Sequence, residues 1–311
     1  MNQIQEIVSQ VKKVVVGKDA VIGRILMAML AEGHVLLEDV PGVGKTTMAL
    51  AFSRSMDMSY KRMQFTPDVM PSDVTGYTSL GQGGKIGEYV PGAAMCNLFL
   101  ADEINRASSK TQSALLEVME EGNITVDGIS HPVPKPFLVI ATQNPVGSSG
   151  TQPLPESQMD RFMIRLSMGY PDKKNEVEIL KRHQHSISLE SVQKVFSPNE
   201  LILIQQQVET VYVAESIYQY IASLTGWTRN QPAIRLGISP RGSIALLKMS
   251  KSCAYLSGRD YVIPQDVQLV FENVCTHRVF LSPRARVSGL TEQQILKRAL
   301  NQVQAPSVIK S

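Results

Sequence analysis

The sequence predicts an α/β fold with a parallel sheet flanked by helices, followed by a smaller all-α domain. Short apolar runs alternate with amphipathic segments as far as about residue 170. A glycine-rich turn joins the first of these runs to a helix. After Pro171 the segments show only helical periodicity and helical start signals. With 311 residues, the chain is long enough for two such domains.

Five short segments in the first part are predicted strands, and four of them are apolar runs. They cover residues 34–37, 60–65, 98–101, 137–142 and 162–167. Residues 45–55 and 109–121 are predicted helices, and Gly122 ends the second. The alternating stretch NITVDGISHPV contains Asp127-Gly128, a strong hairpin signal. We therefore expect a parallel five-stranded sheet with a hairpin inserted before its fourth strand.

The second part contains four helical segments, and two of them have Ser-Pro start signals at Ser197 and Ser239. No strand alternation separates these segments, which predicts an all-helical domain. We divide the chain into an α/β core, residues 1–185, and a helical domain, residues 186–311. The boundary between them falls in the stretch from about residue 170 to residue 197. The stretch GQGGKIG, residues 81–87, is predicted to be the most flexible loop.

Composition narrows the classes of function. The chain has 31 Lys and Arg against 28 Asp and Glu, a formal net charge of +3, so a dedicated nucleic-acid binder is not expected. Cys96, Cys253 and Cys275 are widely spaced, which favours buried, reduced thiols over a zinc site or disulfides. The first residues are polar, and no apolar run approaches 18 residues. We expect a cytoplasmic protein without a membrane span.

The stretch EDVPGVGKTT is typical of a phosphate-binding loop. Gly42 and Gly44 permit tight curvature, Lys45 can reach the outer phosphates, and Thr46 supplies a hydroxyl for Mg²⁺. The general pattern has a glycine where this sequence has Asp39. We expect the Asp39 carboxylate to point away from the phosphates or to cap a backbone amide. The alternative is a strand, turn and helix with coincidental glycines.

Two further strands end in polar residues at the ligand-binding edge of the predicted sheet. Asp102 can hold Mg²⁺ through water, and the adjacent Glu103 can activate an attacking water. Alternatively, this acidic pair caps the following helix. Gln143-Asn144 ends another strand, where a polar side chain can hydrogen-bond to the attacking water or the γ-phosphate. Asn-Pro also marks turns, so this signal alone is weak.

Two arginines lie at or just before the starts of predicted elements in the later part of the chain. Arg161 stands just before the fifth strand and is suited to spread the charge of a transferring phosphate. The alternative is a surface pair between Asp160 and Arg161. Arg241 lies in the first turn of a helix, where a cation is unfavourable without an anionic partner. That partner can be a phosphate or a carboxylate of the protein, and the residues leave both open.

Together these motifs resemble the AAA+ ATPases, and within them the MoxR family. The resemblance extends from about residue 35 to residue 242. It rests on LLEDVPGVGKT, RMQFTPDVMPSDVTGY, LFLADEINRA, TQSALLEVMEEGNITVDG, VIATQNP, LPESQMDRF and SPRGS. Asp39 belongs to it, because LEDVPGxGKT is the form familiar from MoxR proteins. The resemblance implies a P-loop AAA+ core with a five-stranded parallel sheet and a helical lid.

The resemblance also implies binding of ATP and Mg²⁺ and hydrolysis of the ATP. Lys45 would contact the β- and γ-phosphates, Thr46 and Asp102 would hold Mg²⁺, and Glu103 would activate water. Asn144 would be the first sensor. The phosphates would be wrapped by Gly42, Val43, Gly44, Lys45, Thr46 and Thr47.

For the remaining positions, Arg161 would be an arginine finger reaching a neighbouring subunit's nucleotide, and Arg241 the lid's second sensor. Val16 and Gly17 would lie near the adenine, although a simple helix entry capped by Asp19 is the alternative there. A finger that acts between subunits implies a ring, and we expect a hexamer.

The family resemblance implies a chaperone that remodels or matures partner proteins, often ones with von Willebrand A-type domains. The insertion at residues 71–92 and the Asp127-Gly128 hairpin are expected to contact the client, unless they are only structural. One competing function is a nucleic-acid motor or loader, disfavoured by near-neutral charge and the lack of a basic or aromatic tract. Another is a nucleotide-gated scaffold with little turnover. A GTPase is not expected, since no Asn-Lys-x-Asp motif occurs.

Overall fold

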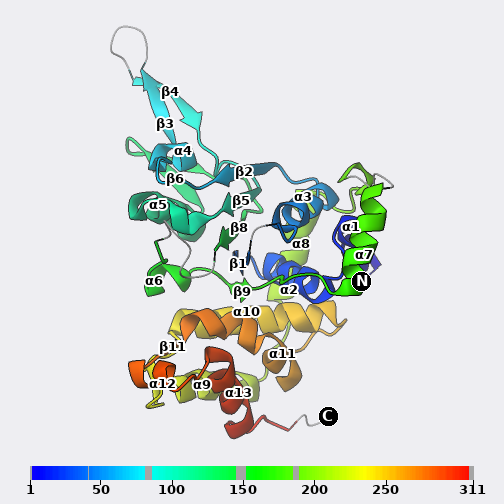
Figure 1. Cartoon of the computed structure of the whole chain (residues 1–311), viewed down its shortest axis with the longest axis vertical. Coiled ribbons are helices and arrows are strands. Elements are labelled where there is room, and N and C mark those ends of the chain that lie inside the picture. The colour runs from blue at the N-terminus through cyan, green and yellow to red at the C-terminus, as the bar shows by residue number, and fades with distance from the viewer. Residues whose placement is uncertain (1, 41, 81–85, 145–151, 185–188, 308–311) are drawn as a thin grey trace.

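The computed structural model describes residues 2–40, 42–80, 86–144, 152–184 and 189–307. In Figure 1 an α/β core lies above a helical lid, and helix α10 (Pro240–Leu256) runs along the boundary between them. The amino terminus belongs to the core and the carboxyl terminus to the lid.

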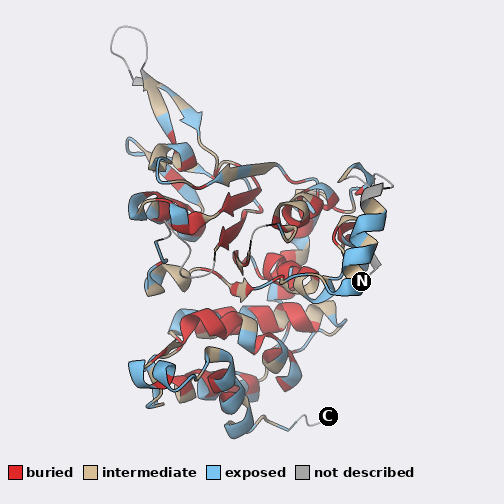
Figure 2. Cartoon of the chain, in the orientation of Figure 1, coloured by how far each residue is buried: buried red, intermediate tan, exposed pale blue. Residues whose placement is uncertain are grey.

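The core is built on a five-stranded parallel sheet in the order β2-β5-β8-β1-β9. All five predicted strands are confirmed, with ends that differ by one or two residues. The central strands are buried because helices cover both faces of the sheet (Figure 2). The strands are β1 (Val35–Glu38), β2 (Tyr60–Gln64), β5 (Leu98–Asp102), β8 (Leu138–Gln143) and β9 (Ile164–Leu166).

Alternate residues of each strand enter two different apolar layers. In β1, Val35 and Leu37 pack in the layer that contains Phe52 of α3. Leu36 packs on the opposite face, with Leu115 of α5. The two predicted helices, α3 (Lys45–Ser55) and α5 (Ser109–Glu121), thus cover opposite faces of the sheet.

Gly122 ends α5 as predicted, with φ 63° and its N–H donating to Val118 O at 3.0 Å.

Among helices within the described ranges, none combines the length and the apolar character needed to cross a bilayer. The other helices that precede residue 198, apart from α4 described below, are α1 (Asn2–Val14), α2 (Asp19–Leu30), η2 (Ile104–Arg106), α6 (Glu156–Met159), α7 (Lys173–Gln184) and η3 (Leu189–Ser191).

Two hairpins extend the core. The predicted hairpin is confirmed as β6 (Asn123–Val126) and β7 (Ile129–Pro132), with Asp127 and Gly128 both at positive φ. The other follows the short helix α4 (Pro71–Thr75), consists of β3 (Gly76–Leu80) and β4 (Ile86–Pro91), and projects away from the sheet in Figure 1. Of the predicted flexible loop, residues 81–85 lie outside the described residues.

The lid is formed mainly by helices, and its Ser-Pro start signals are confirmed. Ser197 and Ser239 cap α8 and α10 by accepting hydrogen bonds from Glu200 N and Gly242 N. The lid also contains two short antiparallel strands, β10 (Ile234–Leu236) and β11 (Phe280–Leu281), which are too brief to show alternation in a sequence. Its other elements are α8 (Pro198–Glu209), α9 (Glu215–Arg229), α11 (Pro264–Cys275), η4 (Thr276–Arg278), α12 (Pro283–Val287) and α13 (Glu292–Gln302).

The predicted domain boundary at 185/186 lies outside the described residues. Core and lid are joined by one continuous apolar cluster, to which α10 and α11 contribute their buried faces (Figure 2). Helix α10 packs on α2, and α11 packs on β9. Helix α8 is also bound to the core, because Gln205 Nε2 donates to Met29 O at 2.8 Å. The lid is therefore packed directly on the core.

The three cysteines are buried and free. Burial raises the pKa of Cys96 to about 11 and the pKa values of Cys253 and Cys275 to about 12. Since only the thiolate is strongly nucleophilic, these are inert core side chains.

Candidate functional site

The glycine-rich turn lies between the end of β1 and the start of α3. Gly42 and Gly44 have φ values of 85° and 94°, which glycine adopts without strain. A Cβ atom at Gly42 would meet nothing within 4 Å, and one at Gly44 would meet only Met168 Cε at 3.9 Å. Because α3 begins at Lys45, its first N–H groups and its dipole favour an anion in this open space. The turn therefore has the shape and polarity of a phosphate cradle.

The two charged residues beside the cradle point in different directions. Lys45 is buried, and its Nζ donates to the backbone oxygen of Asp39 at 3.1 Å. The Asp39 carboxylate instead accepts hydrogen bonds from the segment after β9. Its donors are Ser167 Oγ at 3.0 Å, Gly169 N at 2.9 Å and Met168 N. The expectation that Asp39 caps backbone amides is confirmed, since protein donors occupy both of its oxygens.

Lys18 holds the same segment through its carbonyl groups. Its Nζ donates to Met168 O at 2.6 Å, Gly169 O at 3.0 Å and Tyr170 O at 3.1 Å. Asp39 thus holds this segment by its backbone N–H groups, and Lys18 holds it by its backbone C=O groups. Sequence reasoning missed Lys18, because nothing local distinguishes it from a surface lysine.

The segment also connects the cradle to the stretch around Val16 and Gly17. Gly17 has φ 68°, and a Cβ atom there would lie 2.3 Å from Asn175 Cγ at the start of α7. Asp19 is the first residue of α2 rather than its cap, and it pairs with Lys12. The close approach of Asn175 therefore explains the glycine better than a capped helix entry does.

Replacing Asp39 with glycine restores the general phosphate-loop pattern, yet we expect it to weaken the site. The variant leaves the N–H groups of Met168 and Gly169 without acceptors, at a cost of about 2–4 kcal/mol in the free energy of unfolding. We also expect a lower affinity for a fluorescent ATP analogue. Urea unfolding and equilibrium titration measure the two effects. Asp39→Asn keeps one acceptor oxygen, so its stability and affinity should lie between those of Asp39→Gly and the unmodified protein. An Asp39→Gly variant with undiminished stability and affinity would contradict this account.

Asp102 ends β5 and already has two partners. Thr142 Oγ1 donates to Oδ1 at 2.6 Å, and Arg62 Nη2 forms an ion pair with Oδ2 at 2.7 Å. Arg62 lies on β2, which neighbours β5 in the sheet. A cation at Asp102 would have to share the carboxylate with Arg62. The sequence contained no signal for this pairing, since it depends on the order of the strands.

Glu103 follows in the left-handed conformation, with φ 55°, a strained geometry for a residue other than glycine. Its Oε2 lies 2.8 Å from Arg106 Nη1, and the Asn144 side chain hydrogen-bonds to the same carboxylate. Burial raises the pKa of Glu103, but these hydrogen bonds and the Arg106 charge outweigh burial and lower the pKa below its usual value. Glu103 is therefore ionised at neutral pH, as a general base must be.

The residues at this edge fit a nucleotide and its metal. The cradle over Gly42 and Gly44 is open, and Asn144 Oδ1 is buried without a hydrogen-bond partner. Such an orphaned atom needs a donor, for instance a water. Asp102 and the hydroxyl of Thr46 offer the oxygen donors that Mg²⁺ prefers. No cluster of three or more metal-ligating side chains occurs within the described residues, but Mg²⁺ bound with phosphates needs only one or two carboxylates.

Arg161 and Arg241 lie at the side of the sheet where its strands begin, opposite the carboxyl ends that carry the cradle. Arg161 precedes β9, and Ile164 of that strand pairs with Val35 at the start of β1. The cradle follows Glu38 at the other end of β1, about 13 Å away at roughly 3.3 Å per residue. The structure therefore leaves these two arginines apart from the residues that it gathers at the carboxyl edge, which are Lys45, Asp102, Glu103 and Asn144.

Both arginines bind to Glu120 near the end of α5. Arg161 Nη2 lies 2.8 Å from Oε2, and Arg241 Nη2 pairs with Oε1. Of the two alternatives for Arg241, a carboxylate of the chain is thus its partner here. The surface pair between Asp160 and Arg161 is wrong, because Asp160 pairs with Arg278. Glu120 was missed, since the acidic run MEEG does not show which glutamate faces an arginine.

The two arginines also border a hollow beside the β6–β7 hairpin. It has a volume of about 770 Å³, and its lining includes Glu117 and Glu121 together with Arg161 and Arg241. The lining is mainly polar and open to solvent. Both arginines can therefore meet a charged group that approaches from outside the chain.

Residues 34–164 match the ATPase family associated with various cellular activities (AAA), and residues 227–299 match the AAA lid domain. The chain is 46% identical to the uncharacterized protein YeaC of Bacillus subtilis, over 96% of this chain and 93% of the relative. It is 37% identical to Chaperone MoxR1 of Mycobacterium tuberculosis, over 99% and 84%. A solved Cytophaga hutchinsonii structure, provisionally assigned as an ATPase, is 38% identical with a TM-score of 0.91, covering 98% and 96%. With its P-loop core, its lid and relatives matched over nearly its whole length, the chain belongs to the MoxR family of AAA+ ATPases.

Proposed function

We propose that this chain hydrolyses ATP as a subunit of a ring in which each nucleotide site is completed by a neighbour. One observation carries the proposal: the phosphate cradle and the paired arginines lie at opposite edges of one sheet. A subunit can present its arginines to another subunit's cradle but cannot bring them to its own. Heterologous contacts of this kind form a ring when the rotation between subunits closes, and we propose a closed ring of six subunits.

At the carboxyl edge, each residue has a separate task in this proposal. Lys45 binds the outer phosphates, Glu103 takes the proton from the attacking water, and Asn144 orients that water. Thr46 and Asp102 hold Mg²⁺, which when bound supplies positive charge to the phosphate oxygens. Val16 and Gly17 lie against the adenine. The backbone of Gly42, Val43, Gly44, Lys45, Thr46 and Thr47 surrounds the phosphates.

At the other edge, Arg161 and Arg241 stabilise negative charge on the neighbour's transferring phosphate. Glu120 serves as their counter-ion until that phosphate arrives. In this role Arg161 is the arginine finger, and Arg241 is a second sensor that acts on the same neighbouring site.

The dependence of activity on protein concentration tests this proposal. We expect the ATPase rate per chain to rise steeply with concentration and then to level off, because a lone subunit has no completed site. Phosphate release measured over a dilution series, with the mass of the assembly measured in parallel, gives both quantities. A rate per chain that stays constant down to the monomer would overturn the shared site.

We further propose that the ring is a chaperone that remodels or matures client proteins in the cytoplasm, and that these clients include proteins with a von Willebrand A-type domain. The similarity to Chaperone MoxR1 supports this role. The two hairpins offer surfaces for a client, because Tyr77, Val90 and Ile129 are exposed there. Tight ATP-dependent binding to DNA at physiological salt would favour the nucleic-acid motor instead, and negligible turnover would favour the scaffold.

A further inference from the structure

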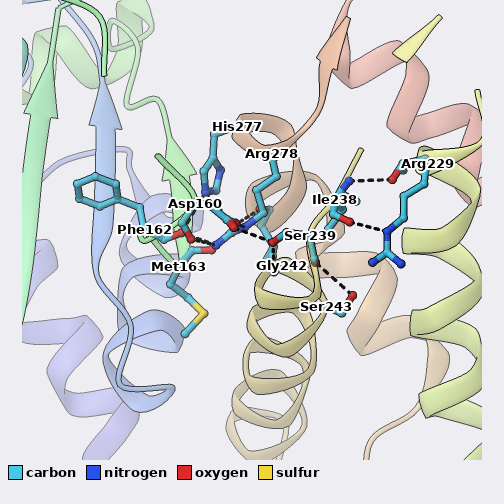
Figure 3. Close-up of polar contacts among 12 residues, drawn as sticks. Asp160, Phe162, Met163, Arg229, Ile238, Ser239, Gly242, Ser243, His277 and Arg278 are labelled. Atoms are coloured by element: carbon cyan, nitrogen blue, oxygen red, sulfur yellow. Dashed lines mark hydrogen bonds and ion pairs between the residues drawn. The ribbon is translucent and has the colours of Figure 1, made fainter. Parts of the chain in front are cut away.

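Arg278 lies at the junction of core and lid, in a place that its position in the sequence does not suggest. It ends η4, directly after α11, and η4 contacts α6 and β9 of the core. Its side chain is only 2% exposed. Figure 3 shows the guanidinium pointing from the lid toward Asp160, Phe162 and Met163. A buried guanidinium with this many acceptors is held in one orientation.

The acceptors of Arg278 are concentrated on the segment that carries Arg161. Nε donates to Asp160 Oδ1 at 2.7 Å, and Nη2 donates to Asp160 O at 3.0 Å and to Phe162 O at 2.6 Å. Nη1 donates to Met163 O at 3.1 Å. The backbone carbonyls on both sides of Arg161 are therefore fixed by one side chain of the lid.

The second oxygen of Asp160 reaches the other arginine. Ser239 Oγ donates to Asp160 Oδ2 at 2.6 Å and accepts from Gly242 N at 3.2 Å, closing the first turn of α10 around Arg241 (Figure 3). A Cβ atom at Gly242 would lie 2.7 Å from Arg278 Cδ, so that turn packs directly on the Arg278 side chain. Asp160 thus links the backbone beside Arg161 to the backbone beside Arg241.

We propose that Arg278 is a positioning residue: through Asp160 and Ser239 it holds Arg161 and Arg241 as a pair aimed at the phosphates bound by a neighbouring subunit. The pair converges on the two oxygens of Glu120, which shows that both guanidiniums can reach one anion. This inference rests on the shared site proposed above. It adds that a movement of the lid displaces both arginines together.

Arg278 could instead only fasten the lid to the core. The hydrogen bonds of Arg278 would contribute to stability under either account, so a loss of stability does not separate them. What separates them is which half of the shared site fails. A positioning role predicts a subunit that binds ATP normally but is defective as a donor of arginines.

Arg278→Lys keeps the charge and removes the planar fork, and it is the main test. We expect kcat to fall about 10- to 100-fold, the loss that a misplacement of about 1 Å can cause. The affinity for a fluorescent ATP analogue should not change, because the subunit's own cradle lies at the other edge of the sheet. Mixing the variant with Lys45→Ala subunits, which retain intact arginines, should restore activity as far as mixing Arg161→Ala with Lys45→Ala does.

Asp266→Asn is the matched control for an indirect effect of lid stability. Asp266 is buried in the lid, where both of its oxygens bind Arg259, at 2.5 and 2.8 Å. We expect this variant to lower the melting temperature but to retain kcat. If Arg278→Lys does not fold, Ser239→Ala carries the test, with a smaller loss of kcat in the same direction and the same recovery on mixing.

Three results would overturn the inference. One is a folded Arg278→Lys variant with normal kcat. Another is a loss that Lys45→Ala subunits do not restore although they restore Arg161→Ala, which would leave only a fastening role. If the Arg161→Ala mixture itself shows no recovery, the shared site fails, and the inference fails with it.

Discussion

Glu103→Gln should bind ATP with nearly normal affinity and hydrolyse it about 10²- to 10⁴-fold more slowly than the unmodified protein. This is the range that a general base contributes. The amide has the shape of the carboxylate but cannot accept the proton of the attacking water. Because the pKa of Glu103 is held below its usual value by Arg106 and Asn144, the unmodified side chain is fully ionised at neutral pH. The rate lost in the variant therefore measures the base itself.

Glu178→Gln is a suitable control. Glu178 pairs with Arg182 at 2.8 Å, the same distance as between Glu103 and Arg106, but it lies on the surface of α7. We expect this variant to keep the normal rate. Steady-state phosphate release and titration with a fluorescent ATP analogue measure turnover and binding separately. Hydrolysis at the normal rate by Glu103→Gln would show that Glu103 is not the general base. Weak ATP binding by the same variant would show that Glu103 contributes to the binding of ATP and not only to its hydrolysis.

Arg161→Ala alone should lose about 10³-fold or more in kcat, as expected for an arginine finger. Mixed in equal amounts with Lys45→Ala, it should recover about a quarter of the normal activity. In a randomly mixed ring, half of the cradles are intact and half of the neighbours supply an intact arginine, so about one site in four is complete. Phosphate release measured after subunit exchange tests this value.

The control for that mixture is Glu103→Gln combined with Lys45→Ala. Both variants are defective at the carboxyl edge, so no arrangement of them completes a site, and no recovery is expected. Recovery there would indicate contamination or subunits that act independently. The absence of recovery with Arg161→Ala would contradict an arginine shared between subunits, provided that the mixed rings assemble.

The local structure of this protein was largely predictable from its sequence. Helices α3 and α5 begin and end at the predicted residues, because Gly44, Ser108 and Gly122 are strong local boundary signals. The five strands were predicted from the sequence, four of them as short apolar runs, and Asp127-Gly128 predicted its hairpin. The short strands β10 and β11 were missed, since two or three residues carry no periodicity.

The partners of charged side chains were not predictable in the same way. Asp102 pairs with Arg62 because β2 and β5 are neighbours in the sheet, although they are separated by more than thirty residues of chain. Glu120 faces Arg161 and Arg241, and Asp160 binds Arg278 of the lid. Such pairings depend on which elements pack together, and neither spacing nor residue type records that.

For this protein the sequence by itself determined most of the helices and strands, the parallel sheet, the phosphate loop and the family. Asp39 marks the limit of that information: the sequence placed it in the loop, and the expectation that it caps an amide came from its chemistry. Only the tertiary structure decided that it binds residues 167–169 and that the two arginines lie across the sheet from the cradle. The physical reason is that local propensities act over a few residues, whereas these contacts exist only once distant segments are packed against one another.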